Sequence, residues 1–407
     1  MATNERYPES DPPQDVYRDP NLRVIFGVTL MAVMGVSSIS PAFPKIAQAL
    51  DVPTARIGLL ITAFTLPGVV FRPLLGLLAD RWGRKVVLIP SLLLFGLAGG
   101  ACALARDFDV LLALRFLQGL GVASLNSLAT TIIGDLYAGL SRATAMGYNA
   151  SVLSIGTASY PLLGGGLAVF GWNFPFLLPL LALPIGVWVI TTLDAPEPDA
   201  DEPIRDYLRS VWISVANPQA LRMFGLTTAT FVVLFGVYLN YVPVLMGEAF
   251  DTSSWVIGLL MSATSLSTAL TSIQVGRISQ RWSEPTLIRA AFGLYALALV
   301  AIPFAPSAGW LVGPALVFGV AQGINIPSLL TILADLAPMA QRGMFMSVNG
   351  MFLRLGQTIG PLATGAVFAW QGTNGVFTLG ASLAAIMFAA IVGLGIPNPS
   401  HRHAEGG

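Results

Sequence analysis

The segment Gly76-Leu77-Leu78-Ala79-Asp80-Arg81-Trp82-Gly83-Arg84-Lys85 separates two long apolar runs, residues 57–79 and 86–105. Five of its ten residues are glycine or basic, which is typical of a tight turn with a positive face. Because the turn is short, the helices on either side of it must lie antiparallel. Asp80 stands at a helix end, where a carboxylate can meet a helix N-terminus or a cation. The segment therefore predicts two adjacent, long apolar helices joined by a basic turn.

The 407-residue chain is strongly apolar, since 55% of its residues are hydrophobic and only 10% are charged. Soluble domains carry about 25% charged residues, so most of this chain must face lipid. The formal net charge of zero argues against a nucleic-acid partner. The one cysteine, Cys102, lies in an apolar run, and both histidines, His401 and His403, lie in a polar tail. These counts exclude a disulfide framework, a thiolate metal cluster and a histidine-based proton relay or metal site within a membrane.

About twelve stretches are long and apolar enough to cross a bilayer as helices, which takes about 20 residues each. They lie roughly at 24–47, 57–79, 86–105, 110–136, 143–169, 174–193, 221–246, 255–276, 286–304, 308–336, 343–369 and 375–396. The predicted fold class is therefore an all-α integral membrane protein with twelve transmembrane helices.

Basic residues are distributed unevenly over the connecting segments. With the N-terminus inside, fifteen of the 21 Lys and Arg residues fall on inner segments and three on outer ones. A bias of this size sets the orientation of a membrane protein. The first 21 residues are polar and proline-rich, without the apolar core of a signal peptide. We expect a multi-pass protein of the cell (inner) membrane with both termini in the cytoplasm.

The longest polar interruption, residues 194–217, divides the chain into two halves. Its first part is acidic and rich in proline, whereas residues 204–212 place apolar side chains at helical spacing. That spacing fits a short helix in the membrane interface, and a loop with chance periodicity is the alternative. Asn217-Pro218 is typical of a helix start. The predicted organisation is a tail over 1–23, a six-helix bundle over 24–193, this linker, a second bundle over 218–396, and a tail over 397–407.

The two halves resemble each other at a fixed offset of 200 residues. The matching pairs include Asp51 and Asp251, Gly58 and Gly258, Gly76 and Gly276, Asp135 and Asp335, Arg142 and Arg342, Asn149 and Asn349, Pro161 and Pro361, and Gly165 and Gly365. Two parallel six-helix repeats are typical of a transporter built by duplication, whose site lies near the membrane midplane between the halves.

The pattern of residues 76–85, G-x-L-a-D-r-x-G-r-k, resembles the loop between the second and third helices of the major facilitator superfamily of transporters. The resemblance extends over nearly the whole chain and implies that superfamily's fold. It also implies a latch at an inner gate, in which Asp135 pairs with Arg84 or Arg142 and Asp80 caps a helix of the other half. The residues assigned to this gate are Gly76, Asp80, Arg81, Gly83, Arg84, Lys85, Asp135 and Arg142.

Glycine and proline gather in the fifth and eleventh predicted spans. Gly156, Pro161, Gly164 and Gly165 resemble the G-x-x-x-G-P-x-x-G-G motif of proton-coupled drug exporters in the same superfamily, and Tyr160 departs from it. The second half repeats the pattern with Gly356, Gly360, Pro361 and Gly365. Small residues let helices approach closely, and proline bends them, so the halves can rock against one another. Plain helix packing is the alternative.

Three arginines lie within predicted spans, where a charge is costly and suggests function. Arg115, Gln118 and Gly119 resemble the R-x-x-q-G-x-g motif of the same exporters, whose arginine is associated with proton transfer; snorkelling to the headgroups is the alternative. Arg354 lies about 18 Å along its helix from Arg342, near mid-membrane. We expect it to contact the substrate or to take part in coupling, and the alternative is a hydrogen bond to carbonyls near Pro361. Arg72 is expected to be structural.

All 21 Asp and Glu residues lie in loops, tails or helix ends, so the charges predicted within spans are all positive. A neutral or anionic substrate therefore fits better than a lipophilic cation. Candidate cavity residues are Ser37, Ser38, Asn126, Tyr238, Asn240, Tyr241, Gln322 and Asn325, each of which can instead be a packing hydrogen bond.

The predicted function is alternating-access transport, with proton-coupled export of a small amphipathic, neutral or anionic compound. A metabolite importer or facilitator without proton coupling is the first alternative. A membrane enzyme or a non-transporting sensor is more remote, because no His, Cys or carboxylate cluster lies inside the spans. A G-x-x-x-x-G-K-[ST] loop is absent from the sequence, so ATP is not the driver. We expect no cofactor, a proton gradient as driving force, a small-molecule substrate in a lipid bilayer, and a monomer.

Overall fold

The computed structural model describes residues 16–195, 217–337 and 342–394, and within these ranges the regular structure is helical. The predicted interfacial helix at 204–212 and both predicted tails, apart from residues 16–23, lie outside the described residues.

The first half contains six spans, several of them interrupted. Its helices are η1 (Val16–Arg18), α1 (Pro20–Ser37), η2 (Ser40–Ala42), α2 (Phe43–Ala49), α3 (Thr54–Ile57), α4 (Leu59–Val70), α5 (Arg72–Trp82), α6 (Arg84–Cys102), α7 (Phe108–Val122), α8 (Leu125–Leu136), α9 (Gly139–Phe170), η3 (Phe174–Leu181) and α10 (Ala182–Thr192).

The second half repeats this order. Its helices are α12 (Pro218–Phe231), the π-helix η4 (Val232–Tyr238), α13 (Leu239–Phe250), α14 (Ser254–Ile278), α15 (Glu284–Ala301), η5 (Ile302–Phe304), η6 (Ala308–Leu311), α16 (Val312–Leu336) and α17 (Arg342–Leu394). Gly372, with φ of 61°, breaks α17 into two helices.

The twelve predicted spans can be followed through the described residues. Ten continuous helical segments are long and apolar enough to cross a membrane, and the bent pair formed by residues 54–70 and 74–82 makes an eleventh. The longest of the ten segments, Phe345–Gly393, contains two helices that meet at Gly372, so it accounts for two spans and brings the total to twelve. The prediction of an all-helical membrane fold is therefore confirmed.

The ends of the helices follow from local chemistry. Asp19 begins α1 by accepting a hydrogen bond from the backbone NH of Asn21 at 2.8 Å, and Asp107 caps α7 in the same way. Asn217 caps α12, with Pro218 at its first position, as expected. Gly83 is the single residue between α5 and α6, and its φ of 102° suits glycine, so the basic turn is as tight as its sequence indicates.

The internal repeat is visible in the backbone and in buried hydrogen bonds. Asp51 and Asp251 are the two non-glycine residues with positive φ in the described chain, at 51° and 47°. Asn149 accepts a hydrogen bond from Thr29 at 2.7 Å, and Asn349 accepts one from Thr227 at 2.8 Å. Residues 200 apart thus occupy equivalent places, which is the structural counterpart of the sequence repeat.

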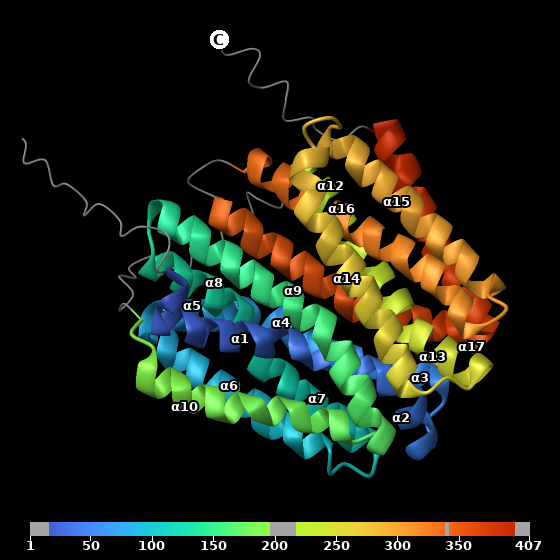
Figure 1. The fold of residues 1–407 in the computed structure, drawn as a ribbon, viewed down its shortest axis with the longest axis horizontal. Helices are drawn as coiled ribbons and strands as arrows, with labels where there is room; N and C mark the ends of the chain where they lie inside the picture. Colours follow the sequence, from blue (N-terminus) through green and yellow to red (C-terminus); the bar gives the residue numbers. More distant parts are fainter. Residues whose placement is uncertain (1–15, 196–216, 338–341, 395–407) are drawn as a thin grey trace, which may run out of the picture.

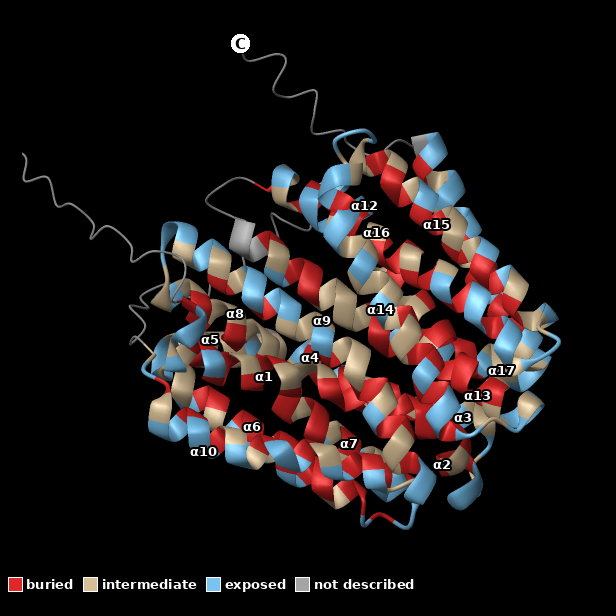
Figure 2. Cartoon of the chain, in the orientation of Figure 1, coloured by how far each residue is buried: buried red, intermediate tan, exposed pale blue. Residues whose placement is uncertain are grey.

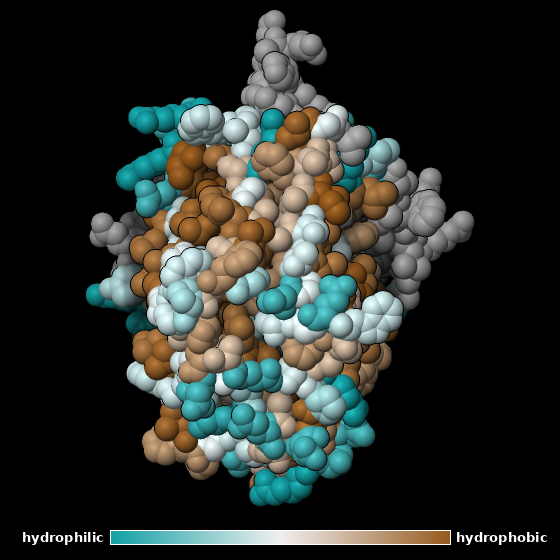
Figure 3. All heavy atoms as spheres, turned by 90° about the vertical axis from the view of Figure 1, so that its right-hand side faces the viewer, coloured by the Kyte–Doolittle hydropathy of each residue, from teal (hydrophilic) through white to brown (hydrophobic). Residues whose placement is uncertain are grey.

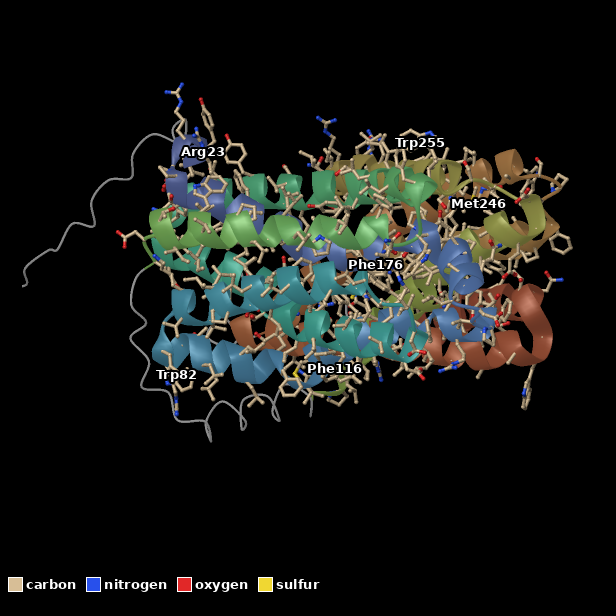
Figure 4. The ribbon with its side chains drawn as sticks, turned by 90° about the horizontal axis from the view of Figure 1, so that it is seen from below. Arg23, Trp82, Phe116, Phe176, Met246 and Trp255 are labelled. Carbon is tan, nitrogen blue, oxygen red and sulfur yellow. The ribbon has the colours of Figure 1, made fainter. Side chains whose placement is uncertain are left out.

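The two halves lie at an angle to each other. In Figure 1 the first half runs across the lower left, with α5, α8 and α10 at its outer end, and the second half rises to the upper right. The α5–α6 turn and the α14–α15 turn lie far apart, whereas α2, α3 and α13 lie together at the opposite corner. Figure 4 likewise places Arg23 and Trp82 at one end and Met246 and Trp255 at the other.

The outer surface of the bundle is apolar. Figure 2 shows buried residues concentrated where helices meet, while the outward sides of the helices are exposed. Many exposed side chains are large and hydrophobic, including Leu97 (58% exposed), Ile155 (64%), Ile273 (79%) and Trp370 (90%). On the face in Figure 3, hydrophobic side chains cover most of the surface, and hydrophilic ones gather toward the lower end and upper left edge. Such a surface is stable in lipid rather than in water.

Candidate functional site

A cavity of about 420 Å³ lies between the two halves. Helices α1, α4, α5, α8 and α9 of the first half line it, together with α12, η4, α13, α14, α16 and α17 of the second half. This volume is within the range of small-molecule sites, which are about 300–1,000 Å³. A site shared by both halves can be exposed to either side of a membrane when the halves rock.

Two arginines lie on the cavity wall where α4 and α5 meet α17. The guanidinium of Arg72 lies over Gly350 of α17, and the side chain of Arg354 lies over Gly68 of α4. The arrangement is reciprocal. Arg72 is four residues after Gly68, which Arg354 contacts, and Arg354 is four residues after Gly350, which Arg72 contacts. Arg72 was expected to have only a structural role, yet it shares this wall with Arg354.

Arg354 makes one side-chain hydrogen bond on the cavity wall. Its Nη1 donates to Oε1 of Gln357 at 3.0 Å, while its Nε has no hydrogen-bond partner. The described residues that line the cavity include no Asp, Glu or His. The wall therefore carries positive charge without a carboxylate among its lining residues. Gln357 was not predicted, although its place three residues after Arg354 on one helix was a usable signal.

The second half contributes an aromatic wall. Tyr238 stacks on Phe318 with ring centroids 4.1 Å apart, and its hydroxyl is 2.5 Å from Oγ1 of Thr264. Gln322 accepts a hydrogen bond from the buried Tyr295, which leaves little freedom for its amide. Phe231 and Phe235 extend the wall along α12 and η4. The cavity thus pairs an arginine region with a rigid aromatic surface.

The predicted cavity residues divide into two groups. Ser37, Asn126, Tyr238 and Gln322 line the cavity, while Ser38, Asn240, Tyr241 and Asn325 are buried elsewhere. Asn240 and Tyr241 follow the π-helix η4, whose wider turns change the direction in which later side chains point. Asn240 faces Gly58, and Asn325 donates to Oγ1 of Thr230 at 2.7 Å.

Arg115 is fully buried inside the first half and does not snorkel. Its Nε donates to the carbonyl of Leu60 at 3.3 Å, and its Nη1 donates to Gln118 at 2.6 Å. Its guanidinium carbon lies 4.1 Å from the ring centroid of Phe64. Gly119 packs directly against the backbone carbonyl of Phe64. Arg115 does not line the cavity. Phe64 does, and its ring lies between Arg115 and the cavity.

Glycines and prolines of the repeat bring the halves into contact at the α2–α3 end. The backbone carbonyl of Pro161 lies directly against Gly258, and the carbonyl of Ser254 lies against Gly165. The related contacts on the other side of the cavity are those of Pro361 with Gly58 and of Ala55 with Gly365. Thr54 also donates to Glu248 at 2.5 Å across this end. A side chain at Gly165, Gly258 or Gly365 would meet the backbone of the other half, whereas one at Gly58 would first meet the side chain of Asn240.

The other predicted hinge glycines pack inside one half. Gly156 faces Leu30 and Val33, and Gly164 faces the carbonyl of Ser38. Gly356 and Gly360 pack on α12 and η4 of their own half. The predicted hinge residues therefore make contacts of two kinds, within one half and between the halves. Those between the halves are made by Gly165, Gly365, Pro161 and Pro361.

The predicted gate residues lie at the opposite end, within the first half. Arg84 contacts Asp80 and donates to Asp135 at 3.2 Å. Lys85 caps the end of α10 by donating to the carbonyl of Leu193 at 2.8 Å. Arg81 is exposed, and Gly76 has open space around its Cα. Arg142 is also exposed and its guanidinium lies near Gly134 of α8, next to Asp135.

Comparison with known proteins places this geometry in a family. The model of the major facilitator superfamily matches residues 25–245 and 226–406. This chain belongs to the major facilitator superfamily. It is a multi-pass membrane transporter and not an enzyme, and the prediction of this family and function class is confirmed. Among the described residues no group of three or more His, Cys, Asp or Glu side chains is arranged to hold a metal ion.

Relatives with similar sequences include an exporter and drug resistance proteins. The bacillibactin exporter of Bacillus subtilis (strain 168) is 30% identical over 200 residues, which cover 47% of this chain and 50% of the exporter. The class B tetracycline resistance protein of Escherichia coli is 24% identical over 366 residues, 86% of this chain and 90% of that protein. The crystal structure of a variant of the nucleoside transporter NupG superposes with a TM-score of 0.78 at 15% identity, over 93% of this chain and 100% of NupG, which shows the shared fold.

Proposed function

We propose that this transporter exports a small amphipathic, neutral or anionic compound from the cell by alternating access, and that it draws on the proton gradient. The observation that carries the proposal is the cavity between the halves, whose described lining residues include Arg72 and Arg354 but no carboxylate. Its mixed lining suits a compound with an apolar body and a polar group. The efflux relatives support export as the direction.

The contacts at the two ends support a rocking mechanism. In this structure Gly58, Gly165, Gly258 and Gly365 hold the halves together at the α2–α3 end, and the α5–α6 end of the first half is far from the α14–α15 turn. The excess of basic residues at the α5–α6 end favours the cytoplasm for that side. With this orientation the proposed conformation is inward-facing, and we propose a monomer with both termini in the cytoplasm. Export follows when the tight glycine contacts separate and the cytoplasmic ends approach.

The residues at the α5–α6 end are the proposed inner gate. Arg84 with Asp80 and Asp135 forms one charged cluster, and its equivalent cannot form in the second half because Glu284 stands at the position of Arg84. A charged cluster in one half is enough to favour one of two conformations, provided that its contacts differ between the inward-open and the outward-open conformation.

The test is accumulation of a panel of neutral and anionic dyes and drugs in bacterial cells depleted of their own efflux pumps. We expect the wild-type protein to lower accumulation of some members several-fold, and collapse of the proton gradient by an uncoupler to abolish the difference. Gly258→Leu should remove the effect, because its side chain meets the backbone of Pro161, whereas Gly225→Leu, which has open space, should retain it. Higher accumulation in cells with the protein would indicate import and contradict the proposal.

A further inference from the structure

The cavity wall also identifies the class of substrate and the way in which energy is coupled to it; this inference rests on the proposed export function. We propose that the substrate is an amphipathic organic anion whose acidic group binds between Arg72 and Arg354. We propose further that the charge of the substrate itself couples export to the electrical part of the proton gradient.

The acidic group is placed by the crossing of the two arginines. Arg354 lies over Gly68 and Arg72 lies over Gly350, so both guanidinium groups reach the same stretch of wall. Arginine presents planar donors that match a carboxylate, sulfonate or phosphate. Gln357 holds one nitrogen of Arg354 at 3.0 Å, while the buried Nε has no partner. An acidic group between the two guanidinium groups would balance both positive charges, which none of the described lining residues does.

The apolar body is placed by the aromatic wall of the second half. Phe231, Phe235, Tyr238 and Phe318 line the same cavity as the arginines. The stack of Tyr238 on Phe318 and the bond of Tyr238 to Thr264 fix this surface. Flat rings bind well to such a surface by stacking and burial of apolar area. An anion that carries an aromatic body therefore uses both parts of the cavity, whereas a cation would face two positive charges.

The charge balance in the spans determines the coupling. Every described Asp and Glu residue lies at or near a helix end, and none lines the cavity. The part of the chain that forms this cavity therefore offers no lining carboxylate to carry a proton. An anion that leaves a cell moves negative charge toward the positive side of the membrane. A potential of 100 mV is worth about 2.3 kcal/mol per charge, which is about a 50-fold concentration ratio.

The test uses purified full-length protein in liposomes and two probes with similar bicyclic bodies and permanent charges. Naphthalene-1-sulfonate stays anionic, and 1-methylquinolinium stays cationic, at all pH values used. Uptake is followed under a potassium diffusion potential set with valinomycin at equal pH, and separately under a pH gradient with the potential clamped at zero. We expect a potential that is positive inside to drive uptake of the sulfonate, and the pH gradient alone to drive none.

Variants connect the flux to the two arginines. Arg354→Gln and Arg72→Gln should each lower sulfonate uptake at least tenfold, while Arg289→Gln, which changes an arginine bonded to the carbonyl of Pro285 outside the cavity, should leave it unchanged. The melting temperature of each variant in detergent shows whether it is folded. If a variant unfolds, the potential dependence and probe selectivity of the wild-type protein still test the proposal.

Three results would overturn the proposal, and they differ in what else they overturn. Uptake of 1-methylquinolinium in place of the sulfonate would refute the anion site but leave a transporter. Sulfonate uptake driven by the pH gradient alone would refute the electrical coupling and leave the proposed function intact. Failure of both probes to move under either gradient would refute the inference, and it would refute the proposed function as well if the panel of dyes and drugs also showed no change of accumulation in cells.

Discussion

The side chain of Arg354 lies over Gly68 of the other half, and its Nε is 3.2 Å from the position that a β-carbon on Gly68 would take. The arginine therefore depends on a glycine that is far away in the sequence. Gly68→Ala should push Arg354 along the cavity wall by a few tenths of an ångström. We expect KM for an anionic substrate to rise several-fold with little change in kcat, as measured by initial rates in liposomes.

The matched control for this prediction is Gly350→Ala. The new methyl group there would meet only the tip of the Arg72 side chain, at 2.9 Å, and this flexible end can swing aside. The effect of Gly350→Ala should accordingly be smaller. Equal KM values for Gly68→Ala and the wild type would show that the position of Arg354 does not matter for binding.

The buried Arg115 should stabilise the first half through its contact with Phe64. A desolvated guanidinium over an aromatic ring contributes about 1–2 kcal/mol. Arg115→Met and Phe64→Leu, alone and combined, form a double-mutant cycle that can be measured by thermal unfolding in detergent. We expect a coupling energy of about 1–2 kcal/mol from this cycle. Strictly additive losses of stability would mean that the 4.1 Å contact is incidental.

Glycines between the halves should control which conformation is populated. Gly258→Ala places a methyl group against the backbone carbonyl of Pro161 in the other half. Because this contact is with backbone, the clash is relieved only when the two halves move apart. The variant should shift the protein away from the state that is closed at the α2–α3 end. Spin labels at Thr54 and Glu248, whose side chains bond at 2.5 Å across that end, report the shift as a longer distance. Cys102, the one native cysteine, is buried and should not be labelled.

A glycine inside one half provides the contrast for this experiment. Gly356 packs against the carbonyl of Thr228 in its own half, so Gly356→Ala should lower the melting temperature without lengthening the distance between the labels. If both variants lengthen that distance equally, the division into contacts between and within the halves has no functional meaning.

The charged cluster at the α5–α6 end should matter in the first half only. Asp135 accepts from Arg84 at 3.2 Å, whereas Asp335 has Glu284 at the equivalent position. Asp135→Asn should therefore slow transport several-fold, and Asp335→Asn should change it little. Stability should change by no more than about 1 kcal/mol in either case, because the Asp135 side chain is 33% exposed and ion pairs near a surface contribute little. Equal transport rates for Asp135→Asn and Asp335→Asn would contradict the claim that the charged cluster acts in the first half only.

Much of the fold could be predicted because lipid imposes a simple rule on sequence. Apolar length indicated the twelve spans, and Asn217 and Gly83 marked a helix start and a tight turn by their own chemistry. The 200-residue offset predicted equivalence, which Asn149 and Asn349 show in their matching bonds to threonine.

The site could be predicted only where local sequence carried its signal. Arg354 was found because a charge in an apolar run is conspicuous. The place of Arg72 on the cavity wall was not predicted, because it depends on how the first half lies against α17. Asn240 and Tyr241 were wrongly assigned to the cavity because the register change at η4 has no clear mark in the sequence. Phe64 looked like any other lipid-facing or core residue, although it separates Arg115 from the cavity.

The most direct evidence for an anion site on the arginine wall would be the current that a substrate anion carries. Liposomes that contain the protein are adsorbed on a solid-supported membrane, and naphthalene-1-sulfonate is added at constant pH. We predict a transient current with the sign of negative charge entering the liposomes, which is lost in Arg354→Gln and retained in Arg289→Gln. A current of the opposite sign, or one that Arg354→Gln leaves unchanged, would contradict the claim that the arginine wall carries an anion.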